Sequence, residues 1–185
     1  MARVATPSDE VMTLCRSLHK FNCPREVEVR PWAFAHESQC FVNVRERVNI
    51  EGGSIRYGWA LWQPCGAFLA AEHHAVWEPP SRTSWIDITP PRLPVNRILF
   101  LPDERAVYQG KLVDNKRLPL VEDHRFREFD RLCGEQIDIE NSLRAKVLTP
   151  NTREILDKRW LDVSGRSQSL RRELYAAYPL PSLAG

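Results

Sequence analysis

The sequence lacks a hydrophobic run long enough for a membrane-spanning helix. Its longest apolar stretches, 67–71 and 98–101, have the length of a β-strand, whereas a membrane helix needs roughly 18 apolar residues. The first twenty residues include the acidic pair Asp9 and Glu10 and have no basic start followed by an apolar segment, so they do not look like a secretory signal. We therefore expect a cytoplasmic protein without a membrane partner.

The sequence also lacks any Cys-x-x-Cys pair. Its five cysteines are an odd number without close spacing, a pattern that favours neither a disulfide framework nor a zinc ribbon. We expect reduced thiols, most of which pack as small apolar side chains. The five are Cys15, Cys23, Cys40, Cys65 and Cys133.

A strong charge of one sign is missing as well. The formal net charge is +2, and the excess of basic residues lies in 141–185, which hold eight Lys or Arg against four Asp or Glu. A solvated helix face accounts for this excess, and no interleaved aromatic pattern accompanies it. The charge distribution therefore gives no reason to expect a nucleic-acid partner.

What the sequence does contain predicts an α+β fold. With 43% hydrophobic and 27% charged residues over 185 positions, it is typical of one soluble globular domain with an extension. Apolar spacing predicts a helix over 8–20, a short strand over 25–30 and a second helix that begins near Cys40 and stops at Gly52 and Gly53. Antiparallel strands are then expected over 55–62, 67–77, 84–89 and 96–101, with a further strand near 105–108.

Beyond about residue 120 the pattern becomes helical. Apolar residues recur at spacings of three and four within 126–133, 155–161 and 170–178. Pro150 is suited to the first turn of a helix, and Pro179 ends the last one. The final third is therefore predicted to be mainly helical.

Cys40, His74 and Asp87 form the combination of residues that suggests chemistry. A nucleophilic cysteine needs a thiolate, which a helix N-terminus and a neighbouring imidazolium both stabilise. Cys40 is expected at such an N-terminus, and His74 is expected within a strand. Asp87 lies on the next strand, where a hairpin brings it beside His74 and allows it to orient the ring.

The same region resembles the transglutaminase-like cysteine enzymes of the papain-like superfamily. His74-Ala75-Val76-Trp77-Glu78 and Trp85-Ile86-Asp87-Ile88-Thr89-Pro90 are similar to the His and Asp signatures of that group. Upstream, the helix that begins at Cys40 and the segment from Gly52 to Gly58 are similar to its cysteine helix and following strand. The resemblance covers about fifty residues.

This resemblance implies a papain-like core, in which a cysteine helix packs on an antiparallel sheet. Residues 1–115 would form that core with its N-terminal helix, and 116–185 a helical extension packed on it within one compact domain. The implied activity is thiol-dependent hydrolysis of an amide or acyl transfer, with Cys40 as nucleophile, His74 as base and Asp87 as the residue that orients it. Peptidase, deamidase and transglutaminase reactions on a peptide, a protein or a small amide all fit, and no cofactor or metal is implied.

Several neighbours of the triad are candidates for supporting roles. An oxyanion hole would combine the Cys40 backbone N–H with a second donor, for which Gln39 is the nearest side chain. Glu78 is a candidate supporting residue, and Trp59, Trp77 and Trp85 fill the core or line a substrate groove. His73 points to the opposite side of its strand from His74 and is expected to face solvent or an edge.

Two other readings of the sequence stay open. The first is a catalytically inactive relative that binds another protein through its helical third, where Leu170, Leu174, Tyr175 and Tyr178 form an apolar stripe. The second is a small zinc protein that uses Cys40, His74 and Asp87, to which His124 and Cys133 add possible ligands. The oligomeric state cannot be read from the sequence.

Overall fold

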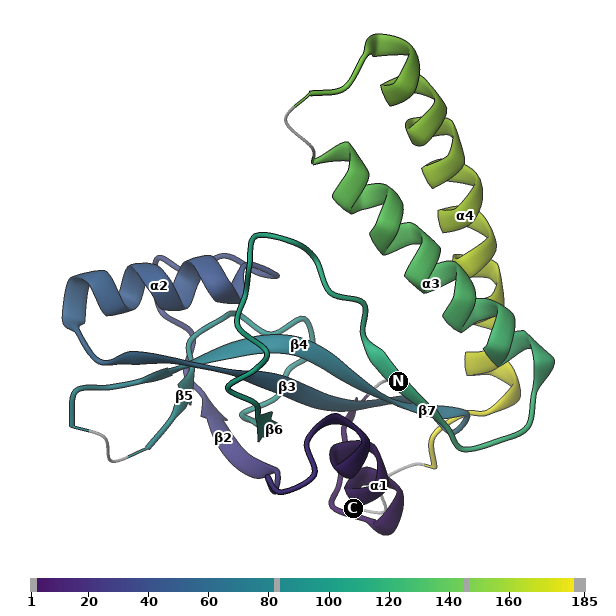
Figure 1. Cartoon of the computed structure of the whole chain (residues 1–185). Coiled ribbons are helices and arrows are strands. Elements are labelled where there is room, and N and C mark those ends of the chain that lie inside the picture. The colour runs from purple at the N-terminus through teal and green to yellow at the C-terminus, as the bar shows by residue number, and fades with distance from the viewer. Residues whose placement is uncertain (1–2, 82–83, 145–146, 182–185) are drawn as a thin grey trace.

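The computed structural model describes residues 3–81, 84–144 and 147–181. Within these ranges the chain forms four helices and seven strands, and the helical part at the C-terminal end projects from a compact β-structure (Figure 1). The strands are β1 (Arg3–Val4), β2 (Arg25–Val29), β3 (Ser54–Cys65), β4 (Phe68–Glu78), β5 (Ile86–Asp87), β6 (Arg97–Pro102) and β7 (Lys116–Pro119).

Five of the strands close into a small barrel. The sheet order is β1-β3-β6-β2-β5-β4-β7, and an additional pairing of β3 with β4 joins the ring β3-β6-β2-β5-β4. All these pairs are antiparallel except β2 with β5. The interior holds Val27, Ala60, Val76, Ile98 and Phe100, which come from four different strands.

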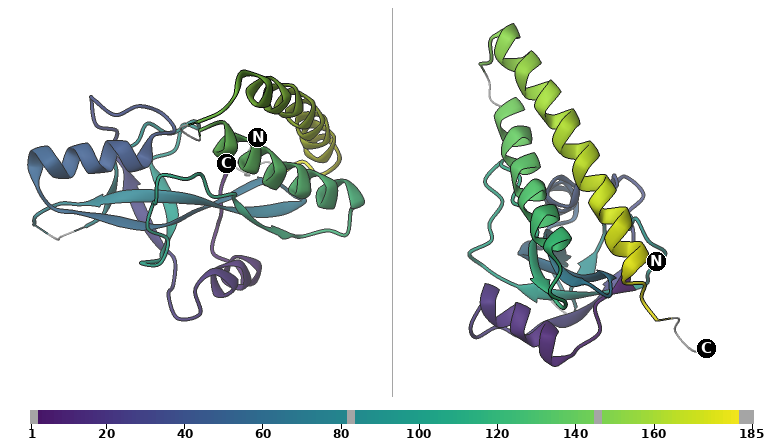
Figure 2. Two further views of the ribbon diagram at one scale, coloured as in Figure 1. Left: turned by 45° about the horizontal axis from the view of Figure 1, so that its top comes forward. Right: turned by 90° about the vertical axis from the view of Figure 1, so that its right-hand side faces the viewer.

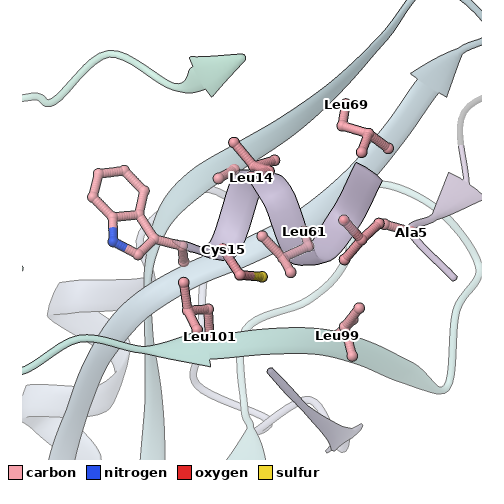
Figure 3. Packing of buried hydrophobic residues seen from close by; sticks show 10 residues of the cluster. Ala5, Leu14, Cys15, Leu61, Leu69, Leu99 and Leu101 are labelled. Carbon is pink, nitrogen blue, oxygen red and sulfur yellow. The ribbon is translucent and has the colours of Figure 1, made fainter. Parts of the chain in front are cut away.

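Helix α1 (Asp9–Leu18) covers one outer face of the barrel. The Ser8 hydroxyl accepts a hydrogen bond from the Val11 N–H and so caps the helix. Figure 3 shows Leu14 and Cys15 of α1 packed on leucines of β3, β4 and β6. This face is entirely apolar at its centre, so hydrophobic burial holds α1 in place.

Helix α2 (Cys40–Glu51) covers a second outer face, beside β4 and β5. Its Val44 packs in a cluster with Ala75, Trp77, Ile86 and Ile88. The helix ends at glycine, because Gly52 has a φ of 75° and donates its N–H to the Val48 carbonyl. The indole N–H of Trp77 donates to the Gly52 carbonyl at 3.0 Å, which fastens the end of the helix to β4.

The last two helices form an antiparallel hairpin. Helix α3 (His124–Leu143) and helix α4 (Pro150–Ala177) lie side by side and extend well beyond the barrel (Figure 2). Their base is attached to it: the Phe68 ring packs on Phe126 and Phe129, and the Gly66 N–H donates to the Tyr178 carbonyl at 2.8 Å. Farther along α3, the Asn141 amide bonds to both backbone groups of Leu112, in the segment before β7. No helix among the described residues is long and apolar enough to cross a membrane.

The predicted mixture of helices and sheet is confirmed, as is the helical final third, but the sheet is antiparallel only in part, because β2 and β5 pair in parallel. One strand prediction is wrong, because 105–108 form a turn and loop instead of a strand. The Asp103 carboxylate accepts the Arg105 backbone N–H at 3.1 Å and the Trp59 indole N–H at 3.2 Å, and these bonds hold the chain in a turn. The strand that pairs with the free side of β4 is instead β7.

Candidate active site

Cys40 is the first residue of α2, and the N-terminus of this helix has no side-chain cap. Gln39 occupies the capping position without making a capping hydrogen bond, so the helix N–H groups are free to act on a negative charge at this end. The residue before it, Ser38, has a φ of 63°, a left-handed conformation that is unusual for serine. The chain therefore turns sharply just before the cysteine.

His74 lies on β4 directly opposite Gly58 of β3. Glycine is required at this position, since a Cβ atom there would lie 2.1 Å from the Leu101 carbonyl oxygen of β6. Close approach of β6 narrows the barrel beside His74, whose ring lies 6.5 Å from that of Phe100. The imidazole is consequently held among packed side chains and is buried.

Asp87 ends β5 and is in direct contact with His74. Trp77 pairs with Ile86 in the register between β4 and β5, so Asp87 and His74 are diagonal neighbours on one face of the sheet. The Asp87 Oδ2 atom lies 3.0 Å from His74 Nε2, and its Oδ1 atom accepts the Thr89 N–H at 3.0 Å. Both carboxylate oxygens are therefore fixed.

His74 also interacts with Cys40. Burial alone would lower the pKa of His74, but the negative charges of Asp87 and Cys40, with hydrogen bonds to both side chains, raise it well above its usual range. Because Nε2 is engaged by Asp87, Nδ1 is the ring nitrogen left for the thiol. The imidazole thus lies between a carboxylate and a sulfur atom and favours its protonated form.

This arrangement has the elements needed for attack by a thiolate. An imidazolium next to a cysteine at a helix N-terminus stabilises the thiolate, and a buried carboxylate fixes the orientation of the ring. Cys40 is mostly buried but retains 8% of its surface, so the sulfur is not sealed in the core. The free N–H groups at the start of α2 are suited to stabilise an oxyanion.

The two candidate supporting residues lie in different surroundings. Gln39 is exposed and directly precedes Cys40. Glu78 lies four residues beyond His74 at the end of β4, where it accepts hydrogen bonds from Ser54, Arg56 and Trp85. These bonds lower the pKa of Glu78 to about 2. Glu78 therefore ties together the strand ends next to the site and does not reach the triad itself.

The tryptophans proposed for a substrate groove are engaged in packing. Trp59 and Trp77 are buried, and their indole N–H groups bond to Asp103 and to the Gly52 carbonyl. Trp85 is partly exposed, with the Arg25 guanidinium 4.1 Å from its ring centre and Phe100 packed edge-on against it. Their placement favours a structural role for Trp59 and Trp77.

His73 is not solvent-facing, contrary to the expectation from the sequence. Its ring is buried between Phe41 and Trp59, and its Nε2 atom lies 2.6 Å from the Ala106 carbonyl. Burial lowers the pKa of His73. The outer face of β4 is covered by α2 and the loop after β6, so side chains on this face are shielded from solvent like those on the inner face.

The geometry of the triad disfavours the zinc alternative. His74 contacts both Cys40 and Asp87, but among the described residues these three side chains do not bring their ligand atoms together closely enough to hold one metal ion. His124 is exposed at the start of α3, and Cys133 belongs to the base of the helical hairpin. Neither of these two residues lies in an element that carries the triad.

Within the described ranges, one group of side chains has ligand atoms close enough together to hold a metal ion: His19, Asp103 and Glu104. These side chains already form hydrogen bonds and an ion pair within the protein. His19 Nδ1 accepts two backbone N–H groups, so in the neutral ring Nε2 carries the proton and faces Glu104. Asp103 is occupied by Trp59 and Arg105. The contacts of this group therefore connect the end of α1 to the turn after β6.

The apolar stripe proposed for partner binding is used within the chain. Leu174 is completely buried, and Leu170, Tyr175 and Tyr178 pack in the same cluster as Phe68, where α4 meets the barrel. The stripe accordingly attaches the hairpin to the barrel.

Sequence reasoning missed one buried polar residue close to the nucleophile. Asn43 lies one turn after Cys40 and shares its buried helical face with Val44. The available signal was that Asn43 lies among apolar positions on one face of the predicted helix. An asparagine buried there must find hydrogen-bond partners.

Comparisons with protein-family models, with curated proteins and with solved structures found no match to this chain.

Proposed function

We propose that this protein is a thiol-dependent acyl-transfer enzyme that cleaves an amide through Cys40, His74 and Asp87. The observation that carries the proposal is the position of His74, which contacts both the carboxylate of Asp87 and the thiol at the uncapped start of α2. Three residues separated by up to 47 positions meet in the order that nucleophile, base and orienting acid require.

In the first half of the proposed reaction, the Cys40 thiolate attacks the carbonyl carbon of the amide. A C–S bond forms, and the carbonyl electrons move to oxygen, where the N–H groups at the start of α2 stabilise the charge. The C–N bond then breaks, and the imidazolium of His74 gives its proton to the departing amine. An acyl thioester on Cys40 and a neutral His74 remain.

In the second half, His74 takes a proton from an incoming water or amine. The acceptor attacks the thioester carbon, a new C–O or C–N bond forms, and the C–S bond breaks to regenerate the thiolate. Asp87 keeps the ring oriented throughout and offsets the charge that His74 carries when protonated. Peptidase, deamidase and transglutaminase reactions differ only in the amide and in the acceptor.

The similarity of the segments around His74 and Asp87 to transglutaminase-like enzymes supports the same proposal, as does a cysteine helix packed on a largely antiparallel barrel. A papain-like identity of the fold is part of the proposal. The substrates implied are peptides, proteins or small amides.

Transfer of an acetyl group from p-nitrophenyl acetate tests the proposal, because this activated ester needs no specific binding groove. The protein is mixed with the ester, quenched at short times and digested, and acetyl-cysteine is located by mass spectrometry. We expect acetylation at Cys40 first, with turnover, and loss of both in His74→Ala. Acetylation that favours the exposed Cys23 over Cys40 and is unchanged in His74→Ala would contradict the proposal.

A further inference from the structure

Asn43 makes more hydrogen bonds than its position in an apolar helix face would suggest. It is 1% exposed. Its Oδ1 atom accepts the His36 N–H at 2.9 Å, and its Nδ2 atom donates to the His36 carbonyl at 2.7 Å and to the Thr89 hydroxyl at 3.1 Å. An amide with all its bonds satisfied in a buried position is well defined in orientation.

The bonds to His36 fix the segment that leads into the nucleophile. The His36 carbonyl also accepts the Gln39 N–H at 3.3 Å, and the Gln39 carbonyl accepts the Asn43 N–H at 2.9 Å. Residues 36–39 are thereby closed into a loop on the first turn of α2. This loop contains Ser38 in its left-handed conformation, which has to be held by its surroundings.

The bond to Thr89 reaches the other side of the site. The Thr89 N–H donates to Asp87 Oδ1, and Asp87 Oδ2 contacts His74. β5 ends at Asp87, so strand pairing does not continue to Thr89. The bond from Asn43 takes over at this position and connects the helix to the segment that carries the acid.

We propose that Asn43 is a positioning residue for the triad: by joining the 36–39 loop to Thr89, it sets the distance between the Cys40 sulfur and the His74–Asp87 pair. This inference rests on the proposed function and deepens it. The two halves of the site come from α2 and from β4 and β5, and Asn43 provides a polar connection between them next to the reacting atoms.

A purely structural role would make a different prediction. An apolar side chain of the same size could fill the position of Asn43 with little loss of packing. Such a side chain could not form the three directional hydrogen bonds of Asn43. If these bonds place the catalytic groups, their loss should slow the reaction, because misplacing a catalytic group by about 1 Å costs roughly a hundredfold in rate.

Two variants separate these roles. Thr89→Val removes the hydroxyl that accepts from Asn43 while it keeps the shape of the side chain and the backbone N–H to Asp87. Thr89→Ser restores an acceptor and serves as the rescue variant. Asn43→Leu removes all three side-chain bonds. Val44→Ala is the matched control, because Val44 follows Asn43 in α2 and is completely buried but has no polar contact.

The measurement is the rate of Cys40 acetylation by p-nitrophenyl acetate against pH, with circular dichroism to establish folding. We expect a fall of roughly 10- to 100-fold in Asn43→Leu. We also expect a shift of the profile to higher pH in Thr89→Val, with return towards wild type in Thr89→Ser. Val44→Ala should keep the wild-type profile even though it loses stability.

Wild-type profiles in both Asn43→Leu and Thr89→Val, or an equal change in Val44→Ala, would overturn the positioning role and leave the proposed function standing. A wild-type protein whose Cys40 shows no dependence on His74 would instead overturn the proposed function and this inference with it.

Discussion

The two outer faces of the barrel each carry a helix with a cysteine, and they treat that cysteine in opposite ways. On the α1 face, Cys15 is completely buried among leucines (Figure 3). On the α2 face, Cys40 stands at the start of the helix beside His74. Ser8 caps α1, whereas no side chain caps α2.

The difference shows how the surroundings of a packed cysteine differ from those of the cysteine that we propose to be reactive. Burial raises the pKa of Cys15 to about 11, so its thiol stays neutral at physiological pH. Cys40 has the imidazole of His74 and the positive end of a helix dipole next to it. Depth of burial alone does not distinguish the two residues, and the polar neighbours do.

The largest expected effect comes from removing the proposed nucleophile. Cys40→Ala should lose acyl-enzyme formation altogether, because no histidine acts on the thiols of Cys15, Cys65 and Cys133 in the part of the chain that the structure describes. Intact-protein mass spectrometry with p-nitrophenyl acetate measures the adduct. Cys15→Ala is the comparison and should retain the adduct; loss of labelling in Cys15→Ala but not in Cys40→Ala would reverse the assignment.

Removing the acid of the buried pair should have the next largest effect. Asp87→Asn leaves His74 without its charged partner, and breaking a buried pair in this way costs about 3–5 kcal/mol of unfolding free energy. The raised pKa of His74 fixes the sign of the pH dependence. The stabilisation is complete below the unfolded pKa of about 6.5 and disappears as the pH rises through the higher folded-state pKa.

Urea unfolding of the wild type and Asp87→Asn between about pH 6 and pH 10 tests this sign. The difference in unfolding free energy should be greatest near pH 6 and shrink towards alkaline pH. A difference that grows with pH would mean that His74 is neutral in the folded protein.

A smaller effect is expected from the packed cysteine. Cys15→Ala removes one buried sulfur atom and leaves a small cavity among the leucines that surround it, so we expect a loss of roughly 1–2 kcal/mol. Thermal or urea unfolding measures it. No change in stability would indicate that α1 packs more loosely than this face suggests.

The smallest effect concerns the turn before Cys40. Glycine adopts the left-handed conformation of Ser38 without strain, but its greater freedom in the unfolded chain offsets part of this gain. Ser38→Gly should therefore raise the unfolding free energy by no more than about 1 kcal/mol. The Ser38 hydroxyl accepts hydrogen bonds from Arg92, but this contact is exposed and contributes little. A clear loss of stability would instead assign the turn to the Arg92 contact.

Much of the fold could be predicted because the long elements carry clear patterns. The start of α2 at Cys40 follows from the apolar spacing and from Gly52, and the hairpin that brings Asp87 to His74 follows from two apolar strands with a turn between them. These are local signals, and the side chains that they bring together are close in sequence.

The rest depends on contacts over long distances in the chain. β1 and β5 have two residues each, too short for any period to appear, and the parallel pairing of β2 with β5 closes the barrel between segments more than fifty residues apart. The burial of His73 needs the loop after β6. Asn43 bonds mainly to backbone atoms, which leave no trace in the sequence of its partners.

The central claim is that His74 activates Cys40 as a nucleophile, and the rate of Cys40 alkylation by iodoacetamide against pH tests it most directly. Peptide mass spectrometry follows all five cysteines in the wild type and in His74→Ala. We predict that Cys40 reacts fastest of the five near neutral pH, and that its rate falls in His74→Ala while the profiles of the other cysteines stay unchanged. An identical Cys40 profile in both proteins would contradict the account.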